Sequence, residues 1–272
     1  MERHGDEMMT GREMKYENIL YKVAEGIATL TLNQPEKRNR LSIQTLSEII
    51  NALETARDDD EVRVIIITGA GDKAFCAGAD ISEFVGNSNL ENRKQYEFYA
   101  KLCTVFNTLG KPSIASVRGW ALAGGFGLAI YPDITIASEG AKFGTPEINV
   151  GVWPMMVSAS FMRAVGRKKA LEMMFSGDII YAREAQALGL VNRVVSDETL
   201  EKETLALAET LKEKSPAIMK LGRDAFYTIM DMEFNTAIEY LKEMIVVLLG
   251  TEDAQEGCKA FVEKRNPVWK GR

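Results

Sequence analysis

The chain has 272 residues, of which 46% are hydrophobic and 26% are charged, and it carries a net charge of −6. A chain of this length and composition can bury the core of one large globular domain. The acidic balance argues against nucleic acid as a partner. Apolar runs such as 244–249 are too short to span a bilayer, so no membrane partner is expected.

Counts of cysteine and histidine restrict the chemistry further. Cys76, Cys103 and Cys258 are widely spaced and odd in number, which favours free thiols in a reducing cytoplasm over a disulfide framework. The only histidine, His4, lies in a polar N-terminal stretch. Triads and dyads that depend on histidine, and histidine-rich metal sites, are therefore excluded from the rest of the chain, and no metal is expected. Proton transfer must then use carboxylates, lysines, tyrosines, cysteines or water.

The first part of the chain predicts an extension, a hairpin and a helix. Residues 1–14 are polar and charged and are predicted to form a flexible extension. The stretch 19–32 alternates on either side of Glu25-Gly26, which predicts a β-hairpin. Ser42 is then expected to cap a helix whose apolar residues recur at helical spacing.

Strands and helices alternate over the next hundred residues. The β-branched run 62–68 predicts a strand that is buried on both faces. Residues 91–109 predict a long helix, and 113–117 and 134–137 predict two further buried strands with a short helix between them at 124–130. This alternation predicts an α/β fold in which helices layer onto a sheet.

After Pro154 the sequence predicts almost only helix. The expected helices span 155–165, 168–175, 182–188, 200–214, 217–230, 234–249 and 252–264, and one strand is expected at 191–195. No linker, low-complexity segment or internal repeat divides the chain. The helical last third is therefore expected to cover the same core or to form an oligomer surface.

Two small-residue loops and one glutamate indicate the chemistry. The loop Phe75-Cys76-Ala77-Gly78-Ala79-Asp80 follows a predicted strand, and Ala123-Gly124-Gly125 opens the short helix, whose first amides have no partner within the helix. Two amides that converge on one oxygen can stabilise an oxyanion. Glu147, in Phe143-Gly144-Thr145-Pro146-Glu147, is then the acid/base within reach. The combination indicates stabilisation of a thioester enolate.

Taken alone, either loop is better explained by close packing, and it is the pair that indicates an oxyanion site. Neither loop matches a phosphate cradle. The chain has no Gly-x-x-x-x-Gly-Lys-Ser/Thr, and Gly124-Gly125-Phe126-Gly127 does not fit Gly-x-Gly-x-x-Gly. Binding of a nucleoside triphosphate or a dinucleotide is therefore not favoured.

Several segments, in the expected order, resemble the enoyl-CoA hydratase/isomerase (crotonase) superfamily. They are 33–39 (Asn-Gln-Pro-Glu-Lys-Arg-Asn), 75–80, 111–125, 143–147, 181–185, 189–192 and 252–271. The resemblance implies a crotonase-like α/β fold, a spiral of ββα repeats with a C-terminal helical trimerisation region. It implies a core over 15–199 and a helical region over 200–272 that packs on the core and on neighbouring subunits, in a homotrimer or homohexamer.

The resemblance also implies an acyl-CoA thioester as substrate and no cofactor beyond the CoA that the substrate carries. Ala79 and Gly124 would supply the oxyanion-hole amides, Glu147 the catalytic carboxylate, and Ala77 a backbone contact to the adenine. The other positions implied for CoA or substrate are Lys37, Arg38, Asp80, Ile81, Ser82, Phe261 and Lys264, the phenylalanine and the last lysine coming from a neighbouring subunit. Each basic residue taken singly is equally well explained as a solvated surface charge.

The sequence departs from the family at one catalytic position. Typical hydratases of the family place two glutamates beside the double bond, and the first corresponds to Gly127, so only Glu147 remains. Hydration requires a water held at one carbon and a proton delivered to the other, and a general base contributes roughly a hundred- to ten-thousand-fold. A double-bond shift requires only one base. Gly127 thus modestly favours isomerisation, and both reactions stay open.

Other functions remain as alternatives. The missing glutamate is also compatible with a catalytically weak or inactive acyl-CoA-binding homologue, or with a decarboxylase or hydrolase branch of the family. Asp80 or Glu83 could face the pocket in its place, whereas Asp133 is expected to be structural. RNA binding through the basic residues of 163–169 is disfavoured by the acidic net charge and by the lack of interleaved aromatic residues.

Overall fold

Two β-sheets form the centre of the molecule. The computed structural model describes residues 11–272; residues 1–10, which include His4, lie outside the described part. In spatial order the larger sheet contains β1 (Arg12–Lys15), β2 (Ile19–Ala24), β3 (Ile27–Leu32), β4 (Val64–Gly69), β6 (Ser113–Val117), β8 (Ile134–Ser138) and β11 (Arg193–Val195). The smaller sheet contains β10 (Ile179–Tyr181), β9 (Lys142–Gly144), β7 (Trp120–Leu122) and β5 (Ala74–Cys76). The pairs β1–β2, β2–β3 and β9–β10 are antiparallel, and the other neighbours are parallel.

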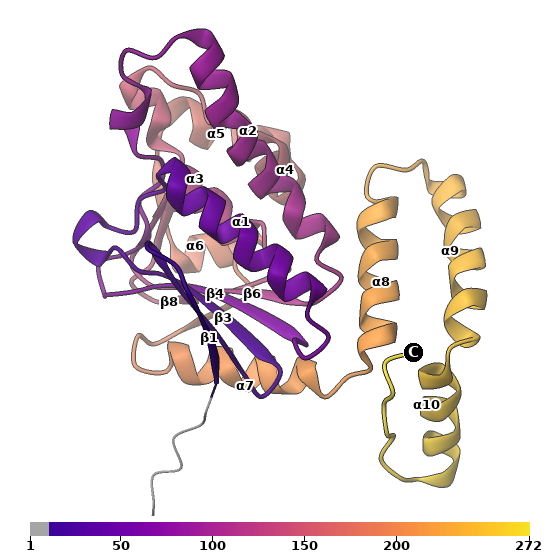
Figure 1. Cartoon of the computed structure of the whole chain (residues 1–272). Coiled ribbons are helices and arrows are strands. Elements are labelled where there is room, and N and C mark those ends of the chain that lie inside the picture. The colour runs from indigo at the N-terminus through magenta and orange to yellow at the C-terminus, as the bar shows by residue number, and fades with distance from the viewer. Residues whose placement is uncertain (1–10) are drawn as a thin grey trace, which may run out of the picture.

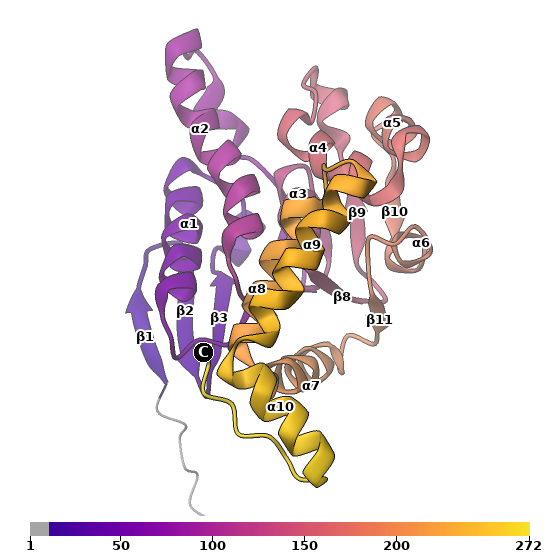
Figure 2. The ribbon, with the colours of Figure 1, turned by 90° about the vertical axis from the view of Figure 1, so that its right-hand side faces the viewer.

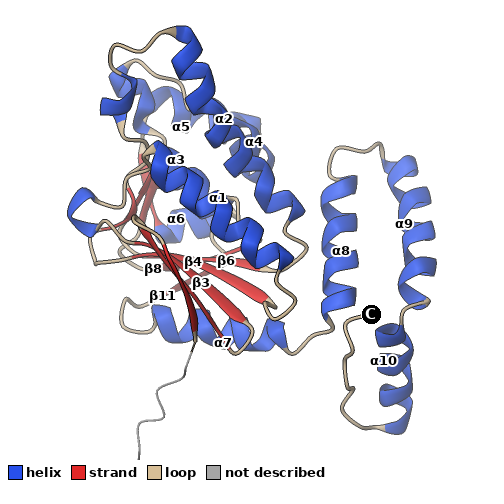
Figure 3. Ribbon diagram, in the orientation of Figure 1, coloured by secondary structure: helices blue, strands red, loops and turns tan. Residues whose placement is uncertain are grey.

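Helices surround both sheets, as Figures 1 and 3 show. They are α1 (Ile43–Asp58), α2 (Asn89–Val105), α3 (Gly124–Ile130), α4 (Met155–Val165), α5 (Arg167–Ser176), α6 (Ala182–Ala187), α7 (Leu200–Lys212), α8 (Pro216–Ile229), α9 (Phe234–Leu249) and α10 (Glu252–Glu263). Short 3-10 helices lie at η1 (Pro35–Lys37), η2 (Ile81–Phe84), η3 (Phe106–Thr108) and η4 (Pro146–Val150). The α/β fold predicted from the alternation of elements is confirmed. No helix within residues 11–272 is both long and apolar enough to cross a membrane.

Strand β4 shows why the larger sheet is covered on both faces. Ile65 and Ile67 pack into the main core together with α1, whereas Val64 and Ile66 pack with the apolar side of α7. Figure 1 shows α1 and α7 on opposite sides of this sheet. Because successive side chains of a strand point to opposite faces, a run of apolar residues is required here. The prediction of a strand buried on both faces is confirmed, with the strand beginning at Val64.

Helix α7 belongs to the core. Leu200 and Ala208 are buried against the second face of the larger sheet, with Leu207 and Leu211 packed alongside. Helices α8 to α10 follow it and project away from the sheets, as Figures 1 and 2 show. The predicted boundary at residue 200 therefore precedes a helix that completes the core, and the projecting region begins with α8.

A partly buried polar cluster connects α8 to the core. The carboxylate of Asp133, just before β8, accepts hydrogen bonds from the amide and hydroxyl of Ser113, both at 2.8 Å. It also accepts from the Arg223 guanidinium at 3.0 Å and from the Tyr227 hydroxyl at 2.7 Å, both on α8. These partners satisfy the carboxylate, and Asp133 is structural, as predicted.

The N-terminal prediction requires correction. Residues 12–14 belong to strand β1, which pairs with β2 from Arg12 opposite Val23 to Lys15 opposite Leu20. The strand lies at the edge of the sheet, and Met14 is its one side chain packed against the core. Because an edge strand with exposed side chains needs few apolar residues, the composition gave no strand signal. Residues 1–10 lie outside the described part of the chain.

The local signals of the hairpin and the first helix are confirmed. Strands β2 and β3 are joined by a two-residue turn in which Glu25 and Gly26 have φ of 48° and 80°. Positive φ at both central positions is typical of the tight turn that suits the twist of a hairpin. At the start of α1, the Ser42 hydroxyl accepts a hydrogen bond from the amide of Thr45 at 3.1 Å, which caps the helix.

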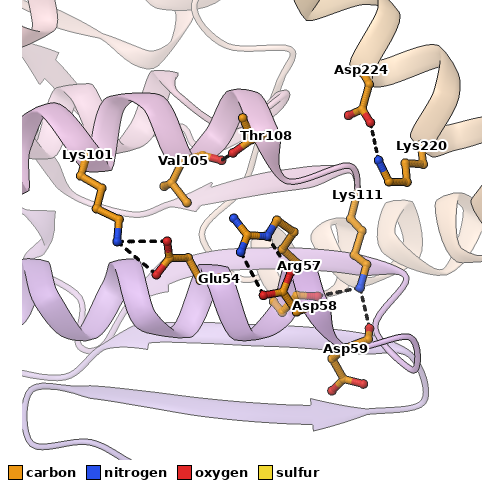
Figure 4. A network of polar contacts seen from close by, with 11 residues as sticks. Glu54, Arg57, Asp58, Asp59, Lys101, Val105, Thr108, Lys111, Lys220 and Asp224 are labelled. Carbon is orange, nitrogen blue, oxygen red and sulfur yellow. Dashed lines mark hydrogen bonds and ion pairs between the residues drawn. The ribbon is translucent and has the colours of Figure 1, made fainter.

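Two lysines hold α1 in place (Figure 4). Lys101 of α2 pairs with Glu54 of α1 at 3.0 Å. Lys111, in the loop before β6, donates to the carbonyls of Ala56 and Asp59 at the C-terminal end of α1. The last carbonyls of a helix lack partners within it and carry partial negative charge, so an ammonium group stabilises them. Helix α1 is thereby fixed at the end opposite to the loops described next.

Candidate active site

Three adjacent strands of the smaller sheet carry the predicted site residues. Strands β5, β7 and β9 are parallel neighbours. Ala79 follows β5, Gly124 follows β7 and Glu147 follows β9. Because parallel strands end at the same edge of a sheet, the fold brings these three residues to one place although they are far apart in sequence. None of these strands was predicted, since each has only three residues and is too short to show a period.

The loop after β5 presents an unused amide. Gly78 has φ of 94°, and a Cβ at this residue would lie 3.3 Å from the amide nitrogen of Gly124. Ala79 forms a parallel bridge in which the amide of Leu41 donates to the Gly78 carbonyl at 2.8 Å and the amide of Asp80 donates to the Leu41 carbonyl at 3.0 Å. This bridge does not use the N–H of Ala79, which is left available to a ligand.

The second amide belongs to Gly124, the first residue of α3. Its N–H has no acceptor within the helix. The preceding residue, Ala123, donates its own amide to the Gly144 carbonyl at 2.9 Å and has φ of 53° and ψ of −124°. This conformation is uncommon for a residue with a side chain, and such strain is typical of functional turns. A Cβ on Gly124 would lie 3.9 Å from the amide nitrogen of Ala79, so the two available amides are close together.

Glu147 is the ionisable group at this edge. Its side chain is half-buried, and within residues 11–272 its Oε2 atom is buried without a hydrogen-bond partner. Burial raises the pKa of this carboxyl to about 7, an effect that a hydrogen bond from its own backbone partly offsets. A carboxyl with a pKa near neutrality can both accept and return a proton at pH 7.

Gly127 makes room for the side chain of Tyr131, which lies one helical turn later. A Cβ at Gly127 would lie 2.6 Å from the Tyr131 hydroxyl oxygen. Helix side chains lean toward the N-terminus, so the tyrosine reaches back along α3. The thiol of Cys103 on α2 donates to this oxygen at 3.1 Å. Burial first, and then Cys103 and Glu147, raise the pKa of the phenol, which therefore keeps its proton. No pattern in the sequence pointed to Tyr131.

Comparison with known proteins identifies the family. The family model for enoyl-CoA hydratase/isomerase matches residues 22–272. The chain belongs to this family. It is 37% identical over 253 residues to the crotonyl-CoA hydratase of Syntrophomonas wolfei, covering 93% of this chain and 97% of the relative. It is also 37% identical over 245 residues to a mitochondrial enoyl-CoA hydratase domain-containing protein 3 of Xenopus laevis, covering 90% and 83% of the two chains.

The solved structures agree with this assignment. The enoyl-CoA hydratase of Bacillus anthracis superimposes with a TM-score of 0.89 at 32% identity, covering 94% of this chain and all of that one. The crotonase-like fold expected from the resemblance is confirmed. The protein is an acyl-CoA-processing enzyme of the enoyl-CoA hydratase/isomerase type.

Two other carboxylates considered for the position of the missing family glutamate are engaged elsewhere. Asp80 accepts hydrogen bonds from the amide and hydroxyl of Ser82, at 3.3 and 2.7 Å, and pairs with Arg40 at 2.9 Å. Glu83 accepts from the amide of Ile43 at 3.0 Å, at the N-terminus of α1. Both side chains stabilise the loop between β5 and α2, and neither is an unpaired carboxylate like Glu147.

The residues implied for CoA binding lie partly in two loops that touch. The amide of Ala77 donates to the Arg38 carbonyl at 3.0 Å. The buried side chain of Asn39 donates to two carbonyls of the segment around β5, at 3.0 and 2.9 Å. Lys37 and Arg38 are exposed at this junction, and Ile81 and Ser82 are exposed just after Ala79 and Asp80. The structure thus brings Lys37 and Arg38 next to the loop that bears Ala77 and Ala79.

Phe261 and Lys264 lie elsewhere. Phe261 is on α10 and is 86% exposed, and Lys264 ends the same helix with φ of 54°. Helix α10 contacts α8 and α9 of its own chain. Figures 1 and 2 place it away from the N-terminus of α3. Within one chain these two residues are not brought to the loops that carry Ala79 and Gly124.

Proposed function

We propose that the protein hydrates 2-enoyl-CoA thioesters through an enolate, with Glu147 as its acid/base. The observation that carries the proposal is the pair of available amides at Ala79 and Gly124, at the sheet edge where Glu147 has a pKa of about 7. The Syntrophomonas wolfei relative is a crotonyl-CoA hydratase, which supports the choice of hydration.

In the proposed reaction the two amides donate hydrogen bonds to the thioester oxygen. The oxygen of a water molecule bonds to the β-carbon, and Glu147 accepts a proton from that water. The electron pair of the double bond moves toward the carbonyl, so that negative charge develops on the oxygen between the two amides. Glu147 then returns a proton to the α-carbon. One preorganised donor of this kind is worth roughly 3–4 kcal/mol in transition-state stabilisation.

Isomerisation is the second candidate, and Gly127 is the observation that favours it. A double-bond shift removes a proton from one carbon and returns it to another, so Glu147 alone can perform both transfers. The same amides would hold the dienolate oxygen. Neither reaction requires a cofactor beyond the CoA that the substrate carries.

We also propose where CoA binds. Lys37 and Arg38 would contact its phosphates, because both are exposed beside the loop that bears Ala79. The amide of Ala77 is already engaged, so its carbonyl would face the adenine. Asp80, Ile81 and Ser82 would line the path of the acyl and pantetheine groups.

The proposed assembly is a homotrimer or a homohexamer. Helices α8 to α10 expose large apolar side chains, among them Phe226 (61%), Phe234 (72%), Val246 (66%) and Phe261 (86%). Side chains of this kind gathered on projecting helices favour burial against another copy of the chain. Phe261 and Lys264 would then close over the CoA of a neighbouring subunit. The three free cysteines suit a reducing cytoplasm, and this location remains a prediction.

The test uses a 2-enoyl-CoA and a 3-enoyl-CoA, each incubated with the protein in heavy water and followed by mass spectrometry. Gain of one water on the 2-enoyl substrate is expected. Conversion of the 3-enoyl to the 2-enoyl compound without such a gain would assign the enzyme to isomerisation. If the protein binds both compounds and changes neither, it is an inactive homologue and the proposal fails.

Two variants complete the experiment. Glu147→Gln removes the only proposed acid/base and is expected to lower turnover at least a hundredfold. Glu139→Gln is the matched control, because Glu139 is exposed and pairs with Arg183 on the surface. Equal activity of Glu147→Gln and wild type would exclude Glu147 as the acid/base.

A further inference from the structure

The hydroxyl of Tyr131 stands in the space that a side chain at residue 127 would fill. The distance of 2.6 Å between this oxygen and a Cβ at Gly127 means that the two cannot coexist without movement. The ring is held on its other side by Phe106, with ring centroids 6.0 Å apart. The tyrosine is 8% exposed and its position is fixed by this packing.

The hydroxyl also lies within the electrostatic reach of the acid/base. The charge of Glu147 contributes to the raised pKa of Tyr131. The side chain reaches back along α3, toward the helix start at which Gly124 presents its amide. The phenol is therefore directed toward the N-terminal end of α3, where the thioester oxygen would be bound.

The contact with Cys103 leaves the hydroxyl proton available. The thiol donates to the phenol oxygen at 3.1 Å and uses one of its lone pairs. A phenol has one proton to donate and two lone pairs to accept. Tyr131 can therefore still donate its proton and accept one more hydrogen bond, which is what is needed to hold a water molecule.

Hydration by one carboxylate has a specific requirement. Glu147 can accept a proton from water and deliver a proton to the α-carbon, so it can serve both transfers in turn. It cannot by itself also fix the direction from which the water oxygen approaches the β-carbon. A second polar group is needed for that purpose, and positioning of a reacting group contributes strongly to rate.

We propose that Tyr131 is this second group and positions the water that Glu147 activates. This inference rests on the proposed hydration of a 2-enoyl-CoA. In the step, the water oxygen, hydrogen-bonded by the Tyr131 hydroxyl, forms the bond to the β-carbon. One of its protons passes to Glu147, and a proton from Glu147 forms the new bond at the α-carbon. Tyr131 gains and loses no proton overall.

The test separates the water step from enolate formation. Hydration of a 2-enoyl-CoA requires both. Exchange of the α-protons of a saturated acyl-CoA in heavy water requires Glu147 and the two amides but no positioned water. Tyr131→Phe is expected to lower the rate of hydration by about 10- to 100-fold. The exchange rate should change by less than about threefold, because the phenol takes no part in it.

Tyr96→Phe is the matched control. Burial raises the pKa of Tyr96, and the charge of Glu147 adds to this effect. The Tyr96 ring packs on Phe84 and Tyr99, with centroids 5.5 and 5.4 Å apart, whereas the atoms nearest to a Cβ at Gly127 all belong to Tyr131. The ratio of hydration to exchange should stay at the wild-type value. Gly127→Ala, which would displace the Tyr131 hydroxyl, should lower this ratio as Tyr131→Phe does.

The outcomes distinguish the two proposals. If Tyr131→Phe lowers hydration and exchange equally, or lowers neither, the tyrosine only fills space and the inference is wrong. If the wild type exchanges α-protons but does not hydrate, the inference also fails, while an enolate chemistry run by Glu147 stands. If the wild type does neither, the proposed function itself has failed.

Discussion

Because the Glu147 carboxyl is buried, replacing it is expected to lower activity but to raise the stability of the folded protein at neutral pH. Burial raises its pKa from 4.5 to about 7 in the folded state. Between these two values the folded protein holds a proton that the unfolded chain has released. Stability therefore falls as pH rises through this range and stays lowered above pH 7. A difference of one in pKa corresponds to about 1.4 kcal/mol, so the full effect is about 3–4 kcal/mol.

Glu147→Gln removes this dependence, because the amide has no charge to lose. Between pH 5 and pH 8 the free energy of unfolding of the variant should rise relative to that of the wild type by about 2–3 kcal/mol. A constant contribution from the new amide, such as an unpaired donor, cancels in this comparison.

The assay is urea unfolding followed by tryptophan fluorescence, at one protein concentration and at both pH values. Glu139→Gln serves as the exposed control and should show no such difference. Parallel pH profiles for Glu147→Gln and wild type would refute the reasoning. They would mean that the Glu147 carboxyl is solvated, and its role as an acid/base near pH 7 would lose its physical basis.

Three further predictions concern the backbone, the core and the assembly. Gly78→Ala should lower kcat/KM at least about a hundredfold with an unchanged circular dichroism spectrum, because its Cβ would clash with the Ala123 Cβ at 2.7 Å and the Leu122 carbonyl oxygen at 2.8 Å and so displace the turn that carries the Gly124 amide. Full activity would contradict the geometry of the two amides. Arg223→Met should reduce the free energy of unfolding in urea by about 3 kcal/mol, since it removes the charged partner of Asp133. A change below about 0.5 kcal/mol, as for a surface substitution, would mean that the Asp133–Arg223 pair does not stabilise the fold. Val246→Glu should give a folded monomer by light scattering, whereas an intact oligomer would place the subunit interface elsewhere.

Long elements could be predicted from the sequence because their residues carry a period. Helices α4 and α9 and strand β6 begin and end at the predicted residues. Helix α2 was predicted two residues too late at its start, and its predicted last turn is the 3-10 helix η3. The apolar faces of these elements are long enough for their spacing to be read directly.

The smaller sheet could not be predicted in this way. Strands β5, β7, β9 and β10 have three residues each, and their side chains do not complete two periods. Their pairing depends on contacts between segments that are distant in the chain. The two loops could nevertheless be singled out as candidates, because Gly78 and Gly124 indicate where the backbone itself must be accessible.

The position of Tyr131 could not be predicted from the sequence for a different reason. Its position depends on the absence of a side chain at Gly127, and this missing volume becomes informative only when the helix is built. The engagement of Asp80 and Glu83 by their neighbours was equally invisible, since an aspartate that stabilises a turn and one that faces a substrate have the same one-letter code.

The two proposed donors to the thioester oxygen are peptide groups, and this has a consequence for how the activity can be lost. Every residue except proline carries the N–H that Ala79 and Gly124 contribute. Most substitutions at these positions would leave the donor itself in place, and damage would come through the shape of the turn. The carboxylate of Glu147, by contrast, disappears with one codon change. Descendants of this chain that lost Glu147 would still bind and polarise a thioester, and would provide a starting point for reactions that draw their proton from another source.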